Sequence, residues 1–479
     1  MFGWVRNTST ALLARIGKSN RAIRRRAERF GLLPAIMAAL VAGVAVAYVA
    51  YQVVNRYTPT SDAKAAPLDI TKVALTIVAG VGGVVALVIA YRRQRDAEQS
   101  RFVARFGAAA AQLGATDVAV RIAGVYAMAG AADETDGLRR QQCIDVLCGY
   151  LRLPYTPDLG GNHQTKNIRK YPAADESSPE DEQHFEYRQN DREVRKTIVR
   201  VIGEHLRPEA EYSWSASHFD LRTAYLENVD FSGAVFVGAA RFDEATFSGD
   251  TWFHTAKFNA DNGFNAATFT GDTWFNGATF SGTAMFDGVS FGGDAGFIGA
   301  TFVGAARFDT ATVTGDAQFN TATFGGDAWF HTATFARGAW FSGAMFSGTA
   351  RFDGTTFRAN TGFGEATFRG GAWFNKVTFS GSTGFREATF GAKASFDEAT
   401  FGGDTSFHTA TFQGPADFTR LVFAARTSFV SVDFGSERVE FTNPQRWGPP
   451  PPEFDWGQDG AGKPGNIEPH DWPPAVNAR

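Results

Sequence analysis

The chain has 479 residues, of which 44% are hydrophobic, and a formal net charge of −4 at pH 7. This balance excludes the strongly basic surface that is typical of nucleic-acid-binding domains, so no nucleic-acid partner is expected. Its two cysteines, Cys143 and Cys148, are spaced as neither a zinc knuckle nor a redox dithiol, and we expect both to be buried thiols.

Two uncharged stretches, residues 32–54 and 73–91, follow a basic segment at residues 1–31. Each stretch is long enough to cross a hydrocarbon core of about 30 Å as a helix. The first is longer than the usual apolar core of a secretion signal, and a second apolar segment follows closely, which disfavours a cleaved signal. The sequence therefore predicts a transmembrane helical hairpin over residues 32–91, with membrane lipid as a partner.

Basic residues flank this predicted hairpin. Those before it are Arg21, Arg24, Arg25, Arg26 and Arg29, those after it are Arg92, Arg93 and Arg95, and the connecting loop has Arg56, Lys64 and Lys72. Because cytoplasmic flanks carry the excess of basic residues, both termini are expected in the cytoplasm. The predicted location is the inner membrane of a bacterial cell, crossed twice, with residues 92–479 in the cytoplasm.

Residues 92–210 show the spacing of amphipathic helices. Apolar residues recur at intervals of three and four at Val118, Ile122 and Val125, at Ile144, Leu147 and Leu151, and at Val194, Ile198 and Ile202. This pattern predicts a small cytoplasmic helical bundle, in which Arg121 is expected to be a solvated or capping residue. Residues 156–190 are rich in Pro, Asn, Asp, Glu and Ser, so a flexible loop is expected there.

Phenylalanine recurs from Phe231 to Phe434 at alternating intervals of five and six. The run contains nineteen eleven-residue units with two such positions each, and of these thirty-eight positions only Val313 is not Phe. A fixed short period indicates a solenoid, in which each unit buries its apolar face by stacking on its neighbours. Helices are disfavoured because the segment is dense in Gly, which costs a helix roughly 1 kcal/mol relative to Ala at each position.

The run Asp220-Leu221-Arg222-Thr223-Ala224-Tyr225-Leu226-Glu227-Asn228-Val229-Asp230-Phe231-Ser232-Gly233-Ala234-Val235-Phe236 resembles the pentapeptide-repeat family. The resemblance implies an all-β, right-handed quadrilateral parallel β-helix (a solenoid) over residues 216–441, preceded by an all-α region with two transmembrane helices. After Phe236 every second pentapeptide has one additional residue, which predicts coils of 22 residues in which Phe242 stacks on Phe264. The substitution at Val313 predicts a small local void.

The repeats contain no arrangement of acid, base, nucleophile or metal ligand that would define a reaction. His254, His331 and His408 are separated by seventy-seven residues, an odd number of eleven-residue units, so they are expected on alternating sides of the rod and too far apart to share a metal ion. We therefore expect no enzymatic activity, no catalytic residue, no cofactor and no metal site.

Tryptophan supplies the most unusual side chains at outward positions of the rod. Trp252, Trp274 and Trp340 differ by multiples of 22 and are expected on one face, with Trp329 and Trp373 on the opposite one. Exposed Trp is a common anchor at protein interfaces, so these five residues are the candidate interface, although packing against the rod explains them equally well at this stage.

The sequence thus favours a membrane-anchored, non-enzymatic scaffold that binds an unidentified protein partner, with homo-oligomerisation left open. Two alternatives remain, a passive structural spacer and an acidic DNA mimic that modulates a type II topoisomerase, as the family resemblance implies. Residues 216–443 contain twenty-three Asp and Glu against fourteen Lys and Arg, which is weakly acidic for a duplex mimic. Residues 442–479, rich in Pro and Gly, are expected to be a disordered tail with a short polyproline run.

Overall fold

A computed structural model of the chain describes residues 67–157, 166–171, 181–186 and 190–477, together with six single residues between positions 41 and 56. The chain divides into two compact units, Met1–Ala104 and Arg105–Arg479. Most of the first predicted membrane span, residues 32–54, lies outside the described residues. The second predicted span, residues 73–91, belongs to helix α3 (Pro67–Leu113). The structure describes the side chains of this helix from residue 79 onward, except that of residue 81. Among the described residues, no helix is both long and apolar enough to span a bilayer.

Three further helices form a compact bundle in the second unit. They are α4 (Val118–Asp133), α5 (Gly137–Leu151) and α6 (Asp191–Leu206). The Asp117 side chain caps α4 by accepting hydrogen bonds from the backbone N–H groups of Ala119 at 2.7 Å and Val120 at 3.3 Å. The apolar stripes of the helices face one another, since Val125, Ile144, Leu147, Ile198 and Ile202 are all fully buried.

Arg121 lies inside this bundle and is fully buried, in contrast to the solvated or capping role that the sequence suggested. Its guanidinium donates to Asp191 at 2.6 Å and to the Tyr150 hydroxyl at 3.1 Å. Arg195 donates to the carbonyl oxygens of Tyr150 at 3.2 Å and of Tyr225 in the first coil of the rod at 3.0 Å. A buried cation is stable only when it is paired and hydrogen-bonded. The partner of Arg121 is Asp191, which lies seventy residues away in the chain.

The predicted flexible loop at residues 156–190 contains a β-hairpin in its described part. Strands β1 (Lys166–Tyr171) and β2 (Asp181–Glu186) pair antiparallel, with Ile168 opposite His184. The Lys170 ammonium contacts the Glu182 carboxylate at 2.7 Å, and the Arg169 guanidinium lies 5.5 Å from the centre of the Phe185 ring. Cross-strand pairs of this kind stabilise a hairpin. The sequence did not predict them because the composition of the segment is mostly polar.

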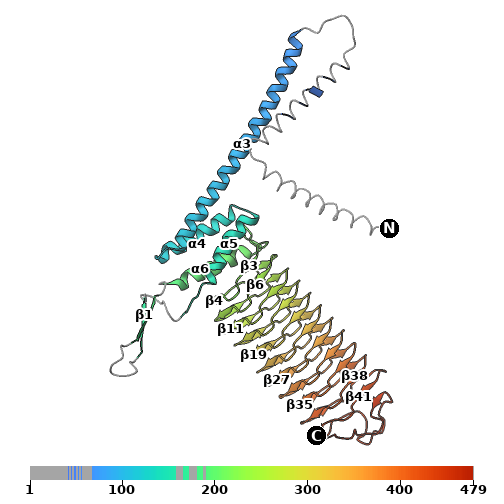
Figure 1. Cartoon of the computed structure of the whole chain (residues 1–479). Coiled ribbons are helices and arrows are strands. Elements are labelled where there is room, and N and C mark those ends of the chain that lie inside the picture. The colour runs from blue at the N-terminus through green and yellow to red at the C-terminus, as the bar shows by residue number, and fades with distance from the viewer. Residues whose placement is uncertain are drawn as a thin grey trace. The chain divides into compact units, whose positions relative to one another are not determined.

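The rod is a stack of coils, each of which has four sides, so that four parallel sheets run along it (Figure 1). We call these sheets faces I to IV in the order in which each coil visits them, so that face I lies opposite face III.
Face I consists of β3 (Phe219–Asp220), β6 (Ala240–Arg241), β10 (Asn262–Gly263), β14 (Ala284–Met285), β18 (Ala306–Arg307), β22 (Ala328–Trp329), β26 (Ala350–Arg351), β30 (Ala372–Trp373), β34 (Ala394–Ser395), β38 (Ala416–Asp417), β41 (Val439–Glu440) and β43 (Ile467–Glu468).
Face II consists of β4 (Tyr225–Glu227), β7 (Thr246–Ser248), β11 (Thr268–Phe269), β15 (Ser290–Phe291), β19 (Thr312–Val313), β23 (Thr334–Phe335), β27 (Thr356–Phe357), β31 (Thr378–Phe379), β35 (Thr400–Phe401), β39 (Val422–Phe423) and β42 (Arg446–Trp447).
Face III consists of β8 (Thr251–Trp252), β12 (Thr273–Trp274), β16 (Ala295–Gly296), β20 (Ala317–Gln318), β24 (Ala339–Trp340), β28 (Thr361–Gly362), β32 (Thr383–Gly384), β36 (Thr405–Ser406) and β40 (Thr427–Ser428).
Face IV consists of β5 (Val235–Phe236), β9 (Lys257–Phe258), β13 (Thr279–Phe280), β17 (Thr301–Phe302), β21 (Thr323–Phe324), β25 (Met345–Phe346), β29 (Thr367–Phe368), β33 (Thr389–Phe390) and β37 (Thr411–Phe412).

The 22-residue coil is confirmed by the strand register. Phe269 pairs with Phe247 on one side and Phe291 on the other, each 22 residues away. Phe242 stacks on Phe264 as predicted, with ring centroids 4.8 Å apart and an interplanar angle of 15°. Each coil contributes four inward Phe positions, so four columns of stacked rings fill the rod. Burial of one Phe contributes on the order of 2 kcal/mol, and these columns therefore dominate the stability of the rod.

The corners of the coil explain the residues between the Phe positions. The N–H of Ala245 donates to the carbonyl oxygen of Phe242 at 3.0 Å, and Glu244 between them has a φ of 58°. A positive φ at the third position of such a turn defines the type II class. The same corner recurs at eleven-residue intervals after faces I and III. Glycine is required instead where the backbones of successive coils touch: a Cβ at Gly370 would lie 2.3 Å from the carbonyl oxygen of Gly348.

The segment predicted as a disordered tail, residues 442–479, is instead folded over the last coil in its described part, up to residue 477. Strands β42 and β43 add to faces II and I. The Phe454 ring stacks on Phe429 at 4.9 Å with an interplanar angle of 3°, which extends one Phe column into this segment. Trp472 packs edge-on against Phe441 and Phe454 at 6.0 and 5.2 Å. Residues 442–477 therefore form an aromatic cap that covers apolar surface at the end of the stack.

Candidate functional site

Face III positions Trp252, Trp274 and Trp340, as the spacing predicted. Trp274 pairs in register with Trp252, and Trp340 follows three coils further along the same sheet. The outward direction of these side chains follows from the strand: Thr273 and Ala339, the preceding residues, point into the rod and are buried. Trp329 and Trp373 lie on face I, on the opposite side of the rod.

The five tryptophans are half-buried, not fully exposed as the sequence suggested. The rings of Trp274, Trp340 and Trp373 lie against glycines of the rod, because those positions have no side chain to hold the indole away. A Cβ at Gly296 would lie 2.4 Å from Cε3 of Trp274, and a Cβ at Gly362 would lie 3.0 Å from Cε3 of Trp340. Each of these indoles thus has one side against backbone and the other side directed outward.

The outer sides of the rings differ between the two faces. On face I, the Arg307 guanidinium lies 4.8 Å from the centre of the Trp329 ring, and the Lys393 ammonium lies 5.5 Å from that of Trp373. Such cation–π contacts place a positive charge over one face of the ring. Within the part of the chain that the structure describes, no cation lies over the three tryptophans of face III. Of these five tryptophans, only the two on face I have a cation over the ring, and the Nε1–H of Trp329 there is buried without a hydrogen-bond partner.

A groove continues face III beyond Trp340, with a volume of about 460 Å³. It is lined by Trp340, Asn360, Thr361, Gly362, Ser382, Thr383, Gly384, Asp404, Thr405, Ser406, Arg426 and Ser428. Its floor is made by small outward residues, and a Cβ at Gly384 would meet no atom within 4 Å. This groove was not predicted from the sequence, although four small residues stand 22 residues apart at positions 362, 384, 406 and 428.

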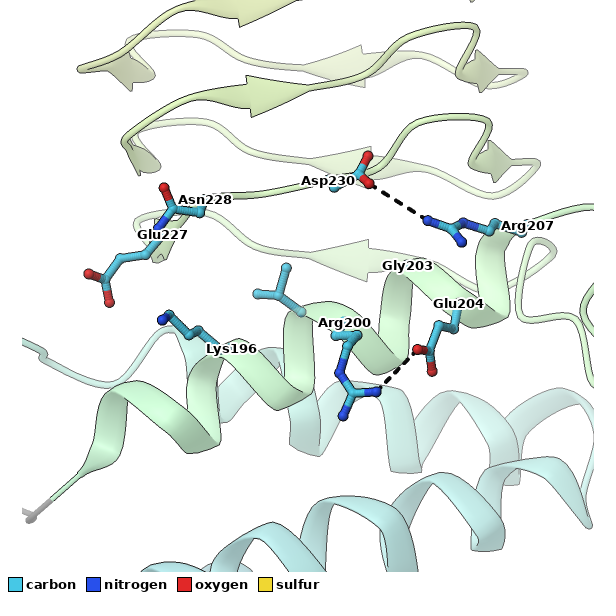
Figure 2. Close-up of a pocket in the computed structure, with 9 residues that line it drawn as sticks. Lys196, Arg200, Gly203, Glu204, Arg207, Glu227, Asn228 and Asp230 are labelled. Atoms are coloured by element: carbon cyan, nitrogen blue, oxygen red, sulfur yellow. Dashed lines mark hydrogen bonds and ion pairs between the residues drawn. The ribbon is translucent and has the colours of Figure 1, made fainter.

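A second hollow lies between α6 and the first coil (Figure 2). It is lined by Lys196, Val199, Arg200, Gly203, Glu204, Arg207, Glu227, Asn228 and Asp230. The cations in it have acidic neighbours: Arg200 contacts Glu204 at 3.2 Å and Arg207 contacts Asp230 at 3.7 Å. Glu227 is held by Arg192 at 2.8 Å. The charges of this hollow therefore cancel internally, and we regard it as the joint between bundle and rod.

The same joint holds a carboxylate with a shifted pKa. The Arg222 guanidinium donates to Asp220 at 2.8 Å and lowers the pKa of that carboxyl to about 2, and Arg152 of α5 forms an ion pair with it. Burial raises the pKa of Cys143 to about 11 and that of Cys148 to about 12. Both thiols are free and buried, which makes them poor nucleophiles.

The histidines that follow a Phe take different surroundings. His331 lies between two aspartates of adjacent coils, with Nδ1 3.0 Å from Asp309 and Nε2 3.5 Å from Asp353. Nδ1 of His408 lies 3.0 Å from the carbonyl oxygen of Val430. Among the described residues, no group of three or more His, Cys, Asp or Glu side chains is arranged to hold a metal ion.

The corner aspartates of the rod are occupied by the backbone. Asp250 accepts a hydrogen bond from the N–H of Asp272 at 3.1 Å, Asp272 from Asp294 at 2.9 Å, and Asp294 from Asp316 at 2.8 Å. Each carboxylate thus satisfies an N–H of the next coil at a corner where the ladder is interrupted. This structural role accounts for the acidic residues without a duplex-mimicking function.

Two-residue parallel strands, stacked in register on four sides around columns of Phe, define a β-helix, a solenoid of the pentapeptide type. The family model for pentapeptide repeats (nine copies) matches residues 264–312, 308–356 and 363–411. The matched part of the rod therefore consists of pentapeptide repeats. Comparisons with curated proteins and with solved structures gave no match. The matched model is not that of a catalytic family.

Proposed function

We propose that this chain is a non-enzymatic scaffold whose rod binds a partner protein through face III. The observation that carries the proposal is the contrast between the two tryptophan-bearing faces. On face I cations of the rod lie over the rings of Trp329 and Trp373, whereas among the described residues no cation lies over the three indoles of face III, and Trp340 there lines a groove. Half-buried aromatic anchors beside a hollow are typical of the energetically dominant part of a protein interface.

Membrane attachment through residues 32–91 is the second part of the proposal. The uncharged stretch 73–91 supports it, because α3 directs large apolar side chains outward there: Val84, Leu87 and Tyr91 are 56, 72 and 67% exposed. Apolar side chains along a helix favour a lipid or protein environment over water. The basic residues on both sides of the two stretches support a bacterial inner-membrane location with the rod in the cytoplasm.

The interaction surface is tested by affinity capture with the full-length protein from gently solubilised membranes. The informative variant carries Trp252→Ala, Trp274→Ala and Trp340→Ala, and the matched control carries Trp329→Ala and Trp373→Ala on the opposite face. We expect the first variant to lose partners that the unmodified protein and the control retain. Equal thermal unfolding of the two variants checks that the loss reflects the surface. Identical partners in all three samples would support the passive-spacer alternative, and a topoisomerase among the lost partners would support the mimic.

Membrane attachment is tested separately by carbonate extraction of membranes and by protease accessibility in inverted vesicles. The proposal requires that the full-length protein stays with the membrane at high pH and that the rod is cut only when the cytoplasmic side is exposed. Release by carbonate would contradict the anchoring part and leave the surface proposal intact.

A further inference from the structure

The outward residues of face III divide it into a raised half and a hollow half. In order from β8 to β40 they are Trp252, Trp274, Gly296, Gln318, Trp340, Gly362, Gly384, Ser406 and Ser428. In the first half the indole of Trp274 also covers Gly296. In the second half the small residues form the floor of the groove described above, with open space above Gly384. Face III thus has large side chains before β24 and a groove after it.

The edge of the face carries a matching difference in charge. The residue before each strand is Asp250, Asp272, Asp294 and Asp316 in the first half, and Asn360, Ser382, Asp404 and Arg426 in the second. The first set has four negative charges, and the second set is neutral because one aspartate and one arginine cancel. A surface with one acidic half and one neutral half favours contact between unlike halves.

We propose that two copies of this chain pair through face III with their rods antiparallel, so that Trp252 and Trp274 of each copy lie in the groove of the other and Trp340 meets its own counterpart at the centre of the contact. The proposal names the partner of the interaction surface inferred above and rests on it. With the twofold axis at β24 and parallel to the strands, Trp252 lies opposite Ser428 and Trp274 opposite Ser406. Because the contact is isologous, each complementary pair occurs twice.

This arrangement also matches the remaining features of the face. The indole of Trp274, where it covers Gly296, lies opposite the open space at Gly384. Asp250 lies opposite Arg426, which allows an ion pair at each end of the contact. The one encounter of like charges is Asp272 opposite Asp404. A parallel pair would place all three tryptophans against their own counterparts and groove against groove, which leaves a void, whereas in the antiparallel pair only Trp340 meets its counterpart, so steric fit selects the antiparallel pair.

The area of the contact between the two copies indicates how tightly they should bind. Nine strands at a spacing of about 4.8 Å cover about 38 Å, and one side of the rod is about 10 Å wide. Two such faces bury roughly 800 Å² before the relief of the indoles is counted, which is at the low end for specific contacts. We therefore expect a dimer with a dissociation constant in the micromolar range, which forms readily where the local concentration of the protein is high.

The test is sedimentation velocity of the full-length protein in a mild detergent over a wide concentration range. We expect a monomer–dimer equilibrium that Gly384→Leu weakens at least tenfold, because the added side chain fills the groove. The rod has room for this side chain, so the fold should be unaffected. Trp274→Ala should weaken the dimer similarly, and Trp373→Ala on face I should leave it unchanged.

Cross-linking decides the orientation. The antiparallel pair predicts that Ser428→Cys protein mixed with His254→Cys protein is joined by a short bifunctional maleimide, and that neither variant is joined to itself. The native thiols are buried and should not interfere. Efficient joining of Ser428→Cys protein to itself would overturn the antiparallel geometry. A monomer at all concentrations, or a dimer insensitive to Gly384→Leu, would overturn self-association. If such a monomer still captures another protein through face III, the proposed scaffold function stands; if it captures none, both fail.

Discussion

The bundle and the rod reach stability by opposite routes. In the rod the coils repeat the same local solution: stacked Phe rings, interrupted only at Val313, two type II corners, and glycines where backbones touch. In the bundle the decisive contact is unique, a buried arginine held by an aspartate that lies seventy residues further along the chain. The difference teaches that a repetitive fold distributes its stability over many equal contacts, whereas a single polar network concentrates it.

The largest effect is expected from breaking the network in the bundle. Asp191→Ala leaves Arg121 buried without its carboxylate, and removal of one partner of a buried ion pair costs about 3–5 kcal/mol. Hydrogen exchange measured by mass spectrometry should show faster exchange in α4, α5 and α6 and little change in coils distant from them. Replacing both residues with apolar ones of similar size should cost much less. Equal losses in the single and the double variant would contradict the paired role.

The second largest loss of stability is expected from substitution of an apolar core residue of the rod. Phe319 is stacked between Phe297 and Phe341, each at 4.8 Å, and Phe319→Ala should cost about 3–4 kcal/mol through lost burial and a cavity. Hydrogen exchange should rise in the flanking coils and fall back to normal with distance, since each coil touches only its neighbours. Thr323→Ala on the surface of face IV is the control and should have little effect. Loosening of the entire rod would contradict a distributed stability.

Two glycines of the rod differ in how closely the neighbouring coil approaches them, so the same substitution should affect stability differently at each. Gly370→Ala forces a methyl group onto the Gly348 carbonyl and should cost about 1–3 kcal/mol, whereas Gly384→Ala has open space and should change stability by less than about 0.5 kcal/mol. Chemical denaturation followed by tryptophan fluorescence compares the two variants. Equal midpoints would show that the coils can move apart at no cost.

The only gap in the Phe columns offers an expected gain. Val313 is buried and pairs with Phe291 and Phe335 in the sheet. Val313→Phe should complete the column and stabilise the rod by about 1 kcal/mol, because ring contacts replace missing ones. Denaturation midpoints again measure the change. A lower midpoint would mean that the neighbouring rings have already closed around the smaller side chain, with no void left to fill.

The smallest expected effect concerns the joint between the two regions. The pKa of Asp220 is lowered to about 2 by Arg222, below the ordinary value near 4, so its stabilising contribution is complete above about pH 4 and is lost as pH falls through 2. Thermal unfolding followed between pH 5 and 2 should show this loss. Asp220→Asn should remove that part of the pH dependence, and an unchanged profile would contradict it.

The sequence predicted the rod well because its information is local and repeated. The alternation of five and six between Phe positions was enough for the 22-residue coil, the Phe242–Phe264 stack and the sharing of one face by Trp252, Trp274 and Trp340. Each of these follows from counting along a single period. No knowledge of distant contacts was needed, because in the regular coils each strand residue pairs with residues 22 positions away.

The remainder could not be predicted because it depends on contacts without a period. The burial of Arg121 requires Asp191, and nothing near either residue indicates the pair. The aromatic cap looked like a disordered tail because its aromatic residues are separated by Pro and Gly, and only the unfinished last coil gives them a surface to cover. The half-buried positions of Trp274, Trp340 and Trp373 depend on nearby glycines, which the spacing of outward residues along the sequence does not indicate.

The eleven-residue unit has a consequence for how such a chain changes length. Two units make one coil, so duplication of 22 residues adds about 4.8 Å to the rod and leaves every later side chain on its original face. Duplication of a single unit exchanges faces I and III for everything downstream, so that an open indole would move to the opposite side of the molecule. Genes built from such units can therefore lengthen in steps of two without disturbing an inherited binding surface, whereas a step of one splits that surface between two sides.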